Sequence, residues 1–520
     1  MTIIPPYFNL FDYFLGDDRP EGSGRRTAIE FRGSRITYDE LRTEVDYWSS
    51  QIIACGVERG DRVAILLYDS PEFIATFLAV VSIGAVAVPI NTFLSADEVI
   101  FIISDSAARA VIVEEELEHK VDSSQSDSSC SILIVDTEAR PYLELKEDVS
   151  PRPAFPSTTR EDPAFLLYTS GSTGAPKGVL HLHGAIPYTV ESYSNSILGL
   201  TREDRVYSAS RLFFAYGLGN SLSFPLAAGA TVILDSERPQ PARVAKIFEE
   251  QRPTIFFGVP AVYRALLELR GQGGKVDTTS LRLCVSAGEA LPASIFEEWE
   301  RAFNLQILDG IGSTEMLHIF ISNRAGSARA GSSGQAVPGY HARLVDDGGL
   351  EVNDGQPGNL WVAGDSATAG YWKRAELTAQ TIKEGWVKTG DIYRRDEAGF
   401  FYHIGRSDDC FKVRGLWVSP VEVEAALLAH SLVTEAAVVS ARDSRGLATV
   451  KAFVVIRTDR GREALKEELR EFLGSRLPQH KVPTEINFIQ ELPRTSTGKV
   501  QRYKLRAEGQ TGRHGGPDED

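Results

Sequence analysis

The sequence has few cysteines and no cysteine pattern of a disulfide framework or a structural zinc site. Its 520 residues include only Cys55, Cys130, Cys284 and Cys410, and no two of them form a CxxC pair. Small secreted domains and structural zinc sites rely on closely spaced cysteines. We therefore expect a reducing compartment, with cytoplasmic localisation, and assign no role to any of the four.

The sequence also lacks the positive charge of a nucleic-acid-binding protein. Its 55 lysines and arginines are outnumbered by 71 aspartates and glutamates, which gives a formal net charge of −16 at pH 7. Binding to nucleic acid through the phosphate backbone requires a broad basic surface. We therefore expect no nucleic-acid partner, and local donors must hold any anionic ligand.

No hydrophobic run is long and uninterrupted. The first residues, MTIIPPYFNLFDYFLGDD, contain no basic segment followed by an apolar one, so we predict no secretory signal. The longest apolar run, residues 73–90, is interrupted by Gly84 and Pro89. A membrane-spanning helix needs about 20 apolar residues, and we interpret this run as a buried helix followed by a buried strand.

What the sequence does contain is an alternation of apolar strands and helical segments. Thr37 and Glu40 form a capping box that predicts the start of a helix running toward Cys55. Residues 62–67, 86–90, 108–115 and 131–136 are short apolar runs typical of buried parallel strands. We predict the α/β class, with a large N-terminal domain of parallel-sheet layers.

The pattern of predicted elements changes toward the C-terminus. From about Gly349, turn-rich pieces alternate with short strands and predict a β-rich subdomain. A small, mobile α+β domain is expected after it, with strands at 435–442 and 449–457 and an amphipathic helix over 462–473. This helix should carry Leu465, Leu469 and Phe472 on one face. We place the domain boundary between 407 and 408, giving domains 1–407 and 408–520, and expect a disordered tail over about 507–520.

One loop is unusually rich in glycine and hydroxyl residues. The segment YTSGSTGAPKG, residues 168–178, follows a short apolar strand, so its backbone N–H groups and hydroxyls can surround phosphate oxygens. Lys177 adds a positive charge. The spacing matches neither GxxxxGK[ST] nor GxGxxG.

This loop resembles the phosphate loop of the adenylate-forming superfamily, which includes acyl-CoA synthetases, firefly luciferase and peptide-synthetase adenylation domains. Four further stretches resemble family motifs in the same order: DGIGSTEML (309–317), KTGDIY (388–393), GRSDDCFKVRGLWVSPVEVE (405–424) and PRTSTGKVQRYKLR (493–506). The resemblance implies that a carboxylate attacks the α-phosphorus of ATP, and that a thiol then attacks the acyl-adenylate.

The resemblance also implies roles for residues of the N-terminal domain. Glu315 matches the carboxylate that helps to hold Mg²⁺, and Thr314 matches a residue that contacts the α-phosphate, so both are candidates for catalysis. The implied nucleotide-binding residues in this domain are Thr169, Ser170, Gly171, Ser172, Thr173, Gly174, Lys177, Gly288, Glu289, Asp309 and Gly310.

Five more roles follow from the later motifs. Asp391 matches the carboxylate that binds the ribose hydroxyls, and Arg406 matches a second nucleotide contact. Lys499 matches the catalytic lysine that reaches the substrate carboxylate and the α-phosphate. Asp408 matches the hinge of the mobile domain, although the neighbouring Asp409 could occupy that position. Gly415 matches the glycine past which pantetheine enters.

The acyl pocket resembles that of the benzoate–CoA ligase branch. The run FFAYGLG (213–219) and the histidine after TEML carry this resemblance, which implies pocket walls at Ala215, Tyr216, Gly217, Ile311, Gly312 and His318. Small residues beside flat ones suit an aromatic ring. His318 could instead be a packing histidine. Benzoate, anthranilate and salicylate all stay open as substrates.

The function predicted is therefore an aryl-CoA ligase that uses ATP, Mg²⁺ and coenzyme A. Two enzymes are alternatives: a stand-alone adenylation protein that loads a carrier protein, and a fatty acyl-CoA synthetase. A non-catalytic nucleotide-binding regulator and a luciferase-like oxidase are disfavoured, the former because the predicted Lys177, Glu315, Asp391 and Lys499 are all present. A homodimer is an open alternative.

Overall fold

The computed structural model describes residues 5, 7–17, 22–121, 130–135, 158–170, 176–443, 445–456, 462–493 and 500–511. The chain forms two compact units. The first unit comprises Met1–Arg343, Trp361–Thr389 and Ala398–Phe401, and the second comprises Leu344–Leu360, Gly390–Glu397 and Tyr402–Asp520. The predicted boundary between residues 407 and 408 stays a prediction.

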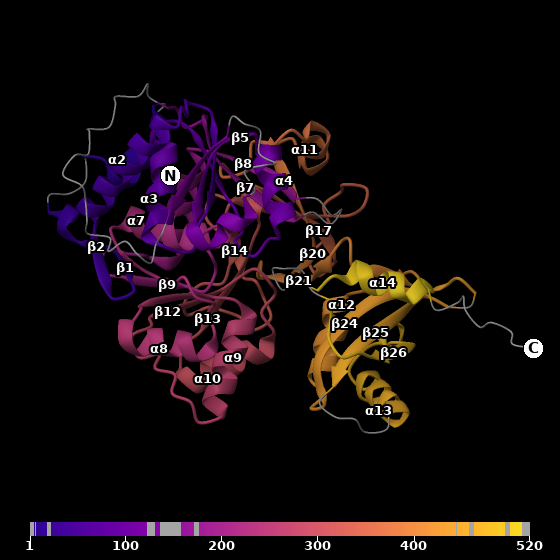
Figure 1. Ribbon diagram of the computed structural model, residues 1–520. Coiled ribbons are helices and arrows are strands. Elements are labelled where there is room, and N and C mark those ends of the chain that lie inside the picture. Colours follow the sequence, from indigo (N-terminus) through magenta and orange to yellow (C-terminus); the bar gives the residue numbers. More distant parts are fainter. Residues whose placement is uncertain are drawn as a thin grey trace, which may run out of the picture. The chain divides into compact units, whose positions relative to one another are not determined.

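A seven-stranded sheet in the first unit has the order β18-β8-β7-β4-β3-β5-β6. Its strands β5, β7 and β8 are labelled in Figure 1. Strands β7, β4, β3, β5 and β6 are parallel to one another, whereas β8 is antiparallel to both of its neighbours, β7 and β18. The strands are β3 (Arg62–Leu66), β4 (Val86–Pro89), β5 (Ala108–Glu114), β6 (Ser131–Val135), β7 (Pro163–Ser170), β8 (Pro176–Leu182) and β18 (Gly370–Tyr371). The predicted α/β class is confirmed.

Two helices of this region lie where the sequence predicts them. Helix α2 (Tyr38–Ala54) starts with a capping box between Thr37 and Glu40. Helix α3 (Pro71–Ser82) is buried along its whole length and leads into β4, which confirms the interpretation of the apolar run 73–90. In the part of the chain that the structure describes, no helix is long and apolar enough to cross a membrane.

A second sheet of the first unit has nine strands in the order β15-β14-β13-β12-β11-β9-β10-β1-β2. The strands from β1 to β13 along this order are parallel. The pairs β1–β2, β13–β14 and β14–β15 are antiparallel. The strands are β1 (Thr27–Phe31), β2 (Ser34–Thr37), β9 (Arg205–Ser208), β10 (Thr231–Leu234), β11 (Ile255–Gly258), β12 (Leu283–Ser286), β13 (Ile307–Gly312), β14 (Ile319–Ser322) and β15 (Gln335–Ala336).

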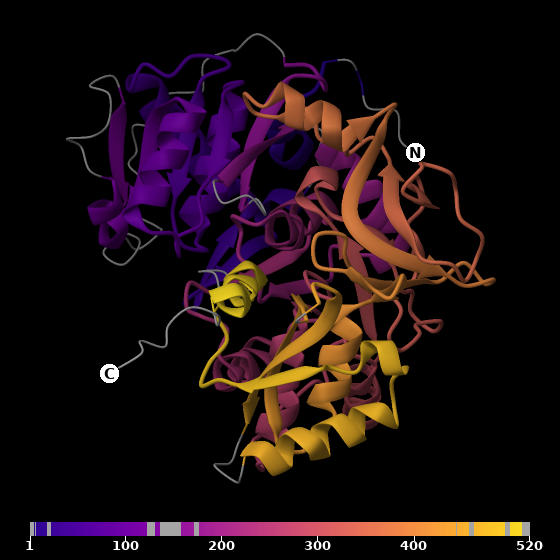
Figure 2. The same ribbon diagram turned by 90° about the vertical axis from the view of Figure 1, so that its right-hand side faces the viewer.

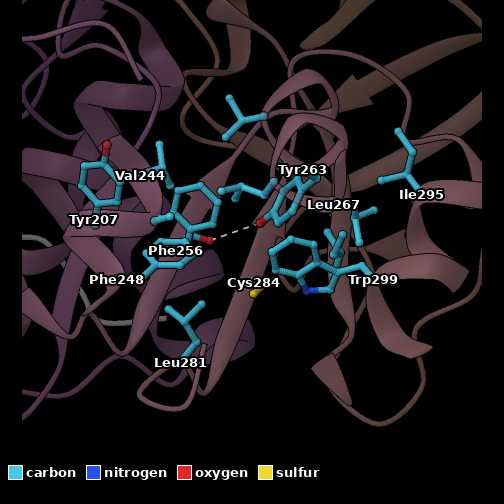
Figure 3. Close-up of a cluster of buried hydrophobic side chains, with 14 of the residues drawn as sticks. Tyr207, Val244, Phe248, Phe256, Tyr263, Leu267, Leu281, Cys284, Ile295 and Trp299 are labelled. Carbon is cyan, nitrogen blue, oxygen red and sulfur yellow. Dashed lines mark hydrogen bonds between the residues drawn. The ribbon is translucent and has the colours of Figure 1, made fainter. Parts of the chain in front are cut away.

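Helices α8 (Pro241–Gln251), α9 (Pro260–Gly271) and α10 (Ala293–Phe303) pack on this sheet. The aromatic core between them includes Phe256, Tyr263 and Trp299, all buried (Figure 3). The rings of Tyr263 and Trp299 meet edge to face at 4.8 Å, and the Tyr263 hydroxyl donates to the Val285 carbonyl at 2.8 Å. The buried Tyr263 hydroxyl therefore has a hydrogen-bond partner. The close-packed aromatic core lies against β11 and β12 and holds their carboxyl ends in place.

The predicted β-rich subdomain is a five-stranded sheet. Its order is β16-β17-β20-β19, with β21 paired to β20. The sheet begins at β16, upstream of the predicted start near Gly349. Its strands are β16 (His341–Val345), β17 (Gly358–Ala363), β19 (Ile382–Lys383), β20 (Trp386–Arg395) and β21 (Phe401–Arg406).

In the second unit, a sheet of β24 (Val433–Arg442), β25 (Ala448–Ile456) and β26 (Glu485–Phe488) carries helices on both faces (Figures 1 and 2). Helices α12 (Pro420–Leu428) and α13 (Arg462–Gly474) cover one face, whereas Leu505 of α14 (Arg502–Thr511) packs on the other. The predicted α+β pattern is confirmed. Helix α14 extends into the stretch predicted as a tail, and 512–520 lie outside the described residues.

One detail of α13 differs from the sequence pattern. We predicted an apolar face of Leu465, Leu469 and Phe472, but the fully packed positions are Leu465, Leu469 and Leu473. Phe472 is only partly buried and its ring contacts His430 at 4.8 Å and Arg476 at 3.7 Å. Positions three and four apart lie on the same helix face, so periodicity alone does not separate Phe472 from Leu473.

Candidate active site

The predicted phosphate loop connects two paired strands. Strands β7 and β8 form an antiparallel hairpin in which Thr169 faces Lys177 and Ser170 faces Pro176. The hairpin therefore holds Thr169 and Lys177 side by side at the base of the loop. The predicted loop residues Gly171, Ser172, Thr173 and Gly174 lie outside the described residues.

Lys177 and Glu315 lie together, with Tyr371 between them. The Lys177 ammonium donates to the Tyr371 hydroxyl at 2.9 Å, and this hydroxyl donates to Glu315 Oε1 at 2.6 Å. Lys177 Nζ is 3.5 Å from the same carboxylate oxygen. Sequence reasoning predicted Lys177 and Glu315 but missed Tyr371, whose only signal is a tyrosine in the short GYW stretch after a turn.

Glu315 lies in a tightly anchored turn. Residues Thr314–Met316 form a single 3₁₀ turn whose preceding residue, Ser313, caps it by accepting from the Met316 N–H. The Thr368 N–H donates to the Glu315 carbonyl at 2.7 Å. These backbone bonds hold the Glu315 side chain beside β8 without using its carboxylate.

His181 supports this turn from β8. Its Nε2 donates to the Thr314 carbonyl at 2.8 Å, and its ring stacks on Phe165 with the centroids 5.1 Å apart. Burial lowers the pKa of His181 to about 4, so the ring is neutral at physiological pH. Sequence reasoning did not select His181, because a histidine in an apolar strand gives no signal of its partner.

The predicted nucleotide residues Asp309 and Gly310 lie in β13. Asp309 is buried, and burial raises the pKa of its carboxyl group well above the ordinary value. Ser333 Oγ donates to Asp309 Oδ2 at 3.5 Å. A side chain at Gly310 would collide with Ile319 of β14 at 2.9 Å, so only glycine fits this strand pairing.

Gly288 and Glu289 follow β12 at its carboxyl end. Both are exposed, and Gly288 has a φ of +90°, a conformation that glycine adopts without strain. Because β9, β11, β12 and β13 are parallel, their carboxyl ends share one edge of the nine-stranded sheet. Ligands of open α/β sheets bind at that edge, and it carries Asp309, Gly288 and Glu289.

The predicted acid pocket contains Tyr216 and His318. Tyr216 lies in helix α6 (Ala215–Leu218), where Ala215 is buried, and its ring is 5.5 Å from the His318 ring and 6.1 Å from Phe257. The Tyr216 hydroxyl donates to the Gly258 carbonyl at 3.3 Å. This bond places the Tyr216 ring over the carboxyl end of β11.

The His318 side chain is buried, and Asn220 is its hydrogen-bond partner. Its Nε2 is 3.1 Å from Asn220 Oδ1, and its ring contacts Phe224 with centroids 4.5 Å apart. Burial lowers the pKa of His318 to about 3, so the ring carries no charge at neutral pH. The sequence did not predict the Asn220 contact. This contact fixes the orientation of the His318 imidazole, which is neutral.

Of the remaining predicted wall residues, Gly217 and Gly312 have no side chain and can offer only backbone to the pocket. Ile311 is partly exposed. A side chain at Gly217 would lie 1.9 Å from the Arg211 carbonyl, and one at Gly312 would lie 2.6 Å from the His318 carbonyl. Close backbone approach therefore explains both glycines. Ile311 is partly buried in β13 and pairs with Ile321 of β14.

In the second unit, Asp391 of β20 and Arg406 of β21 are paired. Arg406 Nη1 donates to Asp391 Oδ1 at 3.2 Å, and His403 Nε2 is 3.8 Å from the same oxygen. Burial raises the pKa of Asp391, but the neighbouring His403 imidazole and the Arg406 charge outweigh it and hold the pKa below the ordinary value. Gly390, at φ +75°, leaves room for the Arg406 guanidinium.

The predicted hinge region contains a cluster of ion pairs. The Asp408 side chain is mostly exposed, whereas Asp409 Oδ1 accepts from Arg506 at 2.6 Å and its Oδ2 lies 3.4 Å from Arg502. Both arginines belong to α14, directly after the predicted catalytic Lys499. Lys499 itself lies outside the described residues.

Gly415 forms the turn of a two-stranded hairpin. It follows Arg414 between β22 (Phe411–Val413) and β23 (Leu416–Val418), with φ values of +52° at Arg414 and +80° at Gly415. Two central residues with positive φ are typical of the favoured hairpin turns. A side chain at Gly415 would meet no atom within 4 Å.

The chain belongs to the AMP-binding enzyme family. The family model of the AMP-binding enzyme matches residues 17–372, and that of the AMP-binding enzyme C-terminal domain matches residues 422–499. The resemblance to the adenylate-forming ligases, drawn from five motifs, is thereby confirmed.

The relatives within this family include ligases of aromatic acids. The chain is 41% identical to benzoate–CoA ligase of Thauera aromatica, over 97% of each chain, and 39% identical to 4-hydroxybenzoate–CoA/benzoate–CoA ligase of Rhodopseudomonas palustris, over 96% of this chain and 94% of that one. The crystal structure of the anthranilate CoA ligase AuaEII in complex with anthranoyl-AMP matches with a TM-score of 0.89 and 36% identity, covering 97% of this chain and 98% of that chain. The predicted likeness to the benzoate–CoA ligase branch is confirmed.

Proposed function

We propose that the protein is an ATP-dependent aryl-CoA ligase. A benzoate-type carboxylate attacks the α-phosphorus of ATP, the bond to the β-phosphate oxygen breaks, and pyrophosphate leaves. The sulfur of coenzyme A then attacks the carbonyl of the aryl-AMP, and AMP departs with its electron pair. The products are aryl-CoA, AMP and pyrophosphate.

One observation carries this proposal. The short segment 314–318 bears Glu315, which contacts Lys177 and Tyr371, and also His318, which contacts Tyr216 and Asn220. The predicted phosphate-binding side chains and the predicted acid pocket therefore adjoin through five consecutive residues. An acid held beside Tyr216 would have its carboxylate near the phosphates, and this proximity is what the first step requires.

The remaining roles follow from the predicted residues. Thr314 contacts the α-phosphate, and the loop of Thr169, Ser170, Gly171, Ser172, Thr173, Gly174 and Lys177 binds the phosphate tail. Gly288, Glu289, Asp309, Gly310, Asp391 and Arg406 bind the nucleoside. Lys499 stabilises the charge that develops during adenylation. Residues 408–520 form a mobile domain that turns at Asp408 between the two steps, and pantetheine enters past Gly415.

Glu315 is the residue that would hold Mg²⁺. Its Oε1 contacts Tyr371 and Lys177, while Oε2 accepts no hydrogen bond from the described residues. Among these residues no group of three or more His, Cys, Asp or Glu could hold a metal ion. A single carboxylate oxygen fits Mg²⁺, which commonly takes its other ligands from substrate phosphates and water. When bound, the ion would neutralise charge on the phosphate oxygens.

The pocket residues support an aromatic acid. Ala215, Tyr216, Gly217, Ile311, Gly312 and His318 would surround the ring, and both polar rings are held by bonds to the protein, Tyr216 to Gly258 and His318 to Asn220. A neutral His318 adds no charge that would select a charged ring substituent. Benzoate, its hydroxy derivatives and anthranilate are thus the substrates to compare.

A panel of acids tests the proposal. Purified protein with Mg²⁺ and ATP is incubated with benzoate, 2-, 3- and 4-hydroxybenzoate, anthranilate, hexanoate and decanoate, with and without CoA. We expect pyrophosphate release with at least one benzoate and its aryl-CoA when CoA is added. Pyrophosphate without aryl-CoA would favour carrier-protein loading, preference for decanoate would favour a fatty acyl-CoA synthetase, and no pyrophosphate from any acid would refute the proposal.

A further inference from the structure

We propose that Tyr371 positions Lys177 and Glu315 for binding of the Mg²⁺–triphosphate group, an inference that rests on the proposed function. The three side chains form a closed set of contacts: 2.9 Å from Lys177 Nζ to the Tyr371 hydroxyl, 2.6 Å from this hydroxyl to Glu315 Oε1, and 3.5 Å from Lys177 Nζ to Glu315 Oε1. The Tyr371 hydroxyl thus touches both charged groups.

The backbone of Tyr371 is held from two sides. In β18 it pairs with Val179 of β8, two positions from Lys177, so both side chains belong to the same strand pair. Its N–H donates to Thr378 Oγ1 at 2.9 Å, and the N–H of the next residue, Trp372, donates to the Gly178 carbonyl at 2.8 Å. Only 5% of the Tyr371 surface is exposed to solvent. A ring fixed in this way can orient the long, flexible side chains of Lys177 and Glu315.

The Tyr371 hydroxyl adds two hydrogen bonds to the ion pair between Lys177 and Glu315, whose charged atoms lie 3.5 Å apart. A phenol accepts one hydrogen bond and donates another, so it satisfies the lysine and one oxygen of the glutamate without adding charge. Because Tyr371 takes only Oε1, Oε2 keeps its capacity for a cation, and Lys177 keeps two further N–H donors for phosphate.

The aromatic ring makes a separate contribution. Lys177 Nζ lies 4.0 Å from the centroid of the Tyr371 ring, within the range of a cation–π contact. Replacing Tyr371 by phenylalanine would retain the ring and remove only the hydroxyl. This substitution therefore separates the hydrogen-bonding role from packing.

The test measures nucleotide binding and kinetics of Tyr371→Phe. Loss of a hydrogen bond to a charged group lowers a binding constant by roughly 10- to 100-fold. We therefore expect the Kd of ATP with Mg²⁺ to rise by about that factor in Tyr371→Phe. Calorimetry in the absence of the acid measures this Kd. The KM for MgATP should rise in parallel, while the KM for the aryl acid should change less than about 2-fold. In EDTA, without Mg²⁺, the two proteins should differ less.

The matched control is Tyr68→Phe, which removes a hydroxyl that donates to Glu116 Oε2 at 3.4 Å in the same unit. It should leave MgATP affinity unchanged. Unchanged MgATP affinity in Tyr371→Phe, or equal loss of affinity for MgATP and for the acid, would overturn the inference. If Tyr371→Phe does not fold, Tyr371→Gln, whose amide can donate and accept, is compared with Tyr371→Leu; equal MgATP affinities in these two would overturn it.

The result also separates this inference from the proposed function. Wild-type protein that binds MgATP but activates no acid would refute the ligase proposal, while the binding difference would still decide the role of Tyr371. Wild-type protein that binds no MgATP would overturn both.

Discussion

The two units build their predicted nucleotide contacts in different ways. In the first unit, Tyr371 lies 194 positions from Lys177 and 56 positions from Glu315 in the sequence. In the second unit, Asp391 and Arg406 are only 15 positions apart, on the adjacent strands β20 and β21. The first arrangement therefore requires an assembled sheet, whereas the second is nearly local. Local construction suits a unit that we propose to contain the moving domain.

The largest expected effect tests whether the second unit serves only one half-reaction through Lys499. In Lys499→Ala we expect benzoate-dependent pyrophosphate exchange to fall by roughly 100-fold or more, because charge on the transferring phosphoryl group loses its stabilisation. Thioester formation from supplied benzoyl-AMP and CoA should stay near the wild-type rate. Lys504→Ala, an exposed lysine of α14, is the control. Equal loss in both half-reactions would contradict the assignment.

Asp391→Asn tests the local arrangement itself. Removal of the charge should raise the KM for ATP by roughly 10-fold, because an ionised carboxylate accepts stronger hydrogen bonds from ribose hydroxyls. Asp354→Asn, which removes an exposed carboxylate paired with Arg395, is the control and should leave this KM unchanged. An unchanged KM in Asp391→Asn would remove Asp391 from the nucleotide site.

The same variant has a defined pH signature. The pKa of Asp391 is lower in the folded protein than its ordinary 3.8, so its ionised form stabilises the fold above that pH and this stabilisation is lost as the pH falls through the folded value. Asp391→Asn should lower the free energy of unfolding by about 1–3 kcal/mol at pH 7, and the difference should shrink toward pH 3. Urea unfolding at both pH values measures it, and a constant difference would contradict this origin.

Gly415→Asn tests whether the second unit admits the thiol of coenzyme A past Gly415, as we propose. Asparagine tolerates positive φ better than other side chains, so the hairpin at +80° should persist while the open space beside Gly415 is filled. We expect thioester formation to slow by a few-fold to roughly 10-fold, with pyrophosphate exchange unchanged, since partial blockage costs about 1 kcal/mol. Gly446→Asn, another exposed glycine with φ +80° in this unit, is the control. Equal slowing of both steps would argue against a channel.

A buried aspartate of the first unit, Asp69, has a pKa that is shifted in the direction opposite to that of Asp391. Asp69 accepts from the Leu212 N–H at 3.1 Å, just before the pocket segment, and is 3.7 Å from Arg211; burial raises its pKa to about 6, although Arg211 and this N–H act the other way. Stability from protonated Asp69 is complete below about pH 3.8 and is lost as the pH rises through about 6.

Asp69→Asn should remove this pH dependence. The unfolding free energy of the wild type, relative to the variant, should fall by at most about 3 kcal/mol between pH 4 and pH 7. Urea unfolding across this range gives the slope, and exposed Asp97→Asn is the control. A difference that rises with pH would show that the Arg211 charge, rather than burial, governs Asp69.

Much of the fold was predictable because its signals are local. Capping residues, short apolar runs and turn residues located α2, α3, β3 to β6 and the β24–β25 pair to within a few residues. The α13 face shows the limit of such signals. Leu473 and Phe472 are adjacent apolar residues, and the sheet beneath them, not the helix period, selects Leu473 for the core.

The candidate site divides in the same way. Lys177, Glu315, Asp391 and Arg406 were predicted because each belongs to a short stretch resembling a family motif. Tyr371, His181, His403 and Asn220 were missed, since each acts through a partner in another stretch. The roles of all these residues in catalysis and binding stay predictions until the variants are measured.

The sequence by itself determined the order of the elements, the loop chemistry between β7 and β8, and the family of the chain, because these depend on contiguous residues. Only the tertiary structure decided that β18 pairs with β8 and brings Tyr371 to Lys177 and Glu315. It also decided that His318 faces Asn220 as a neutral ring. Strand pairing between distant segments and burial of a titratable ring arise from the packed core as a whole, which no local pattern encodes.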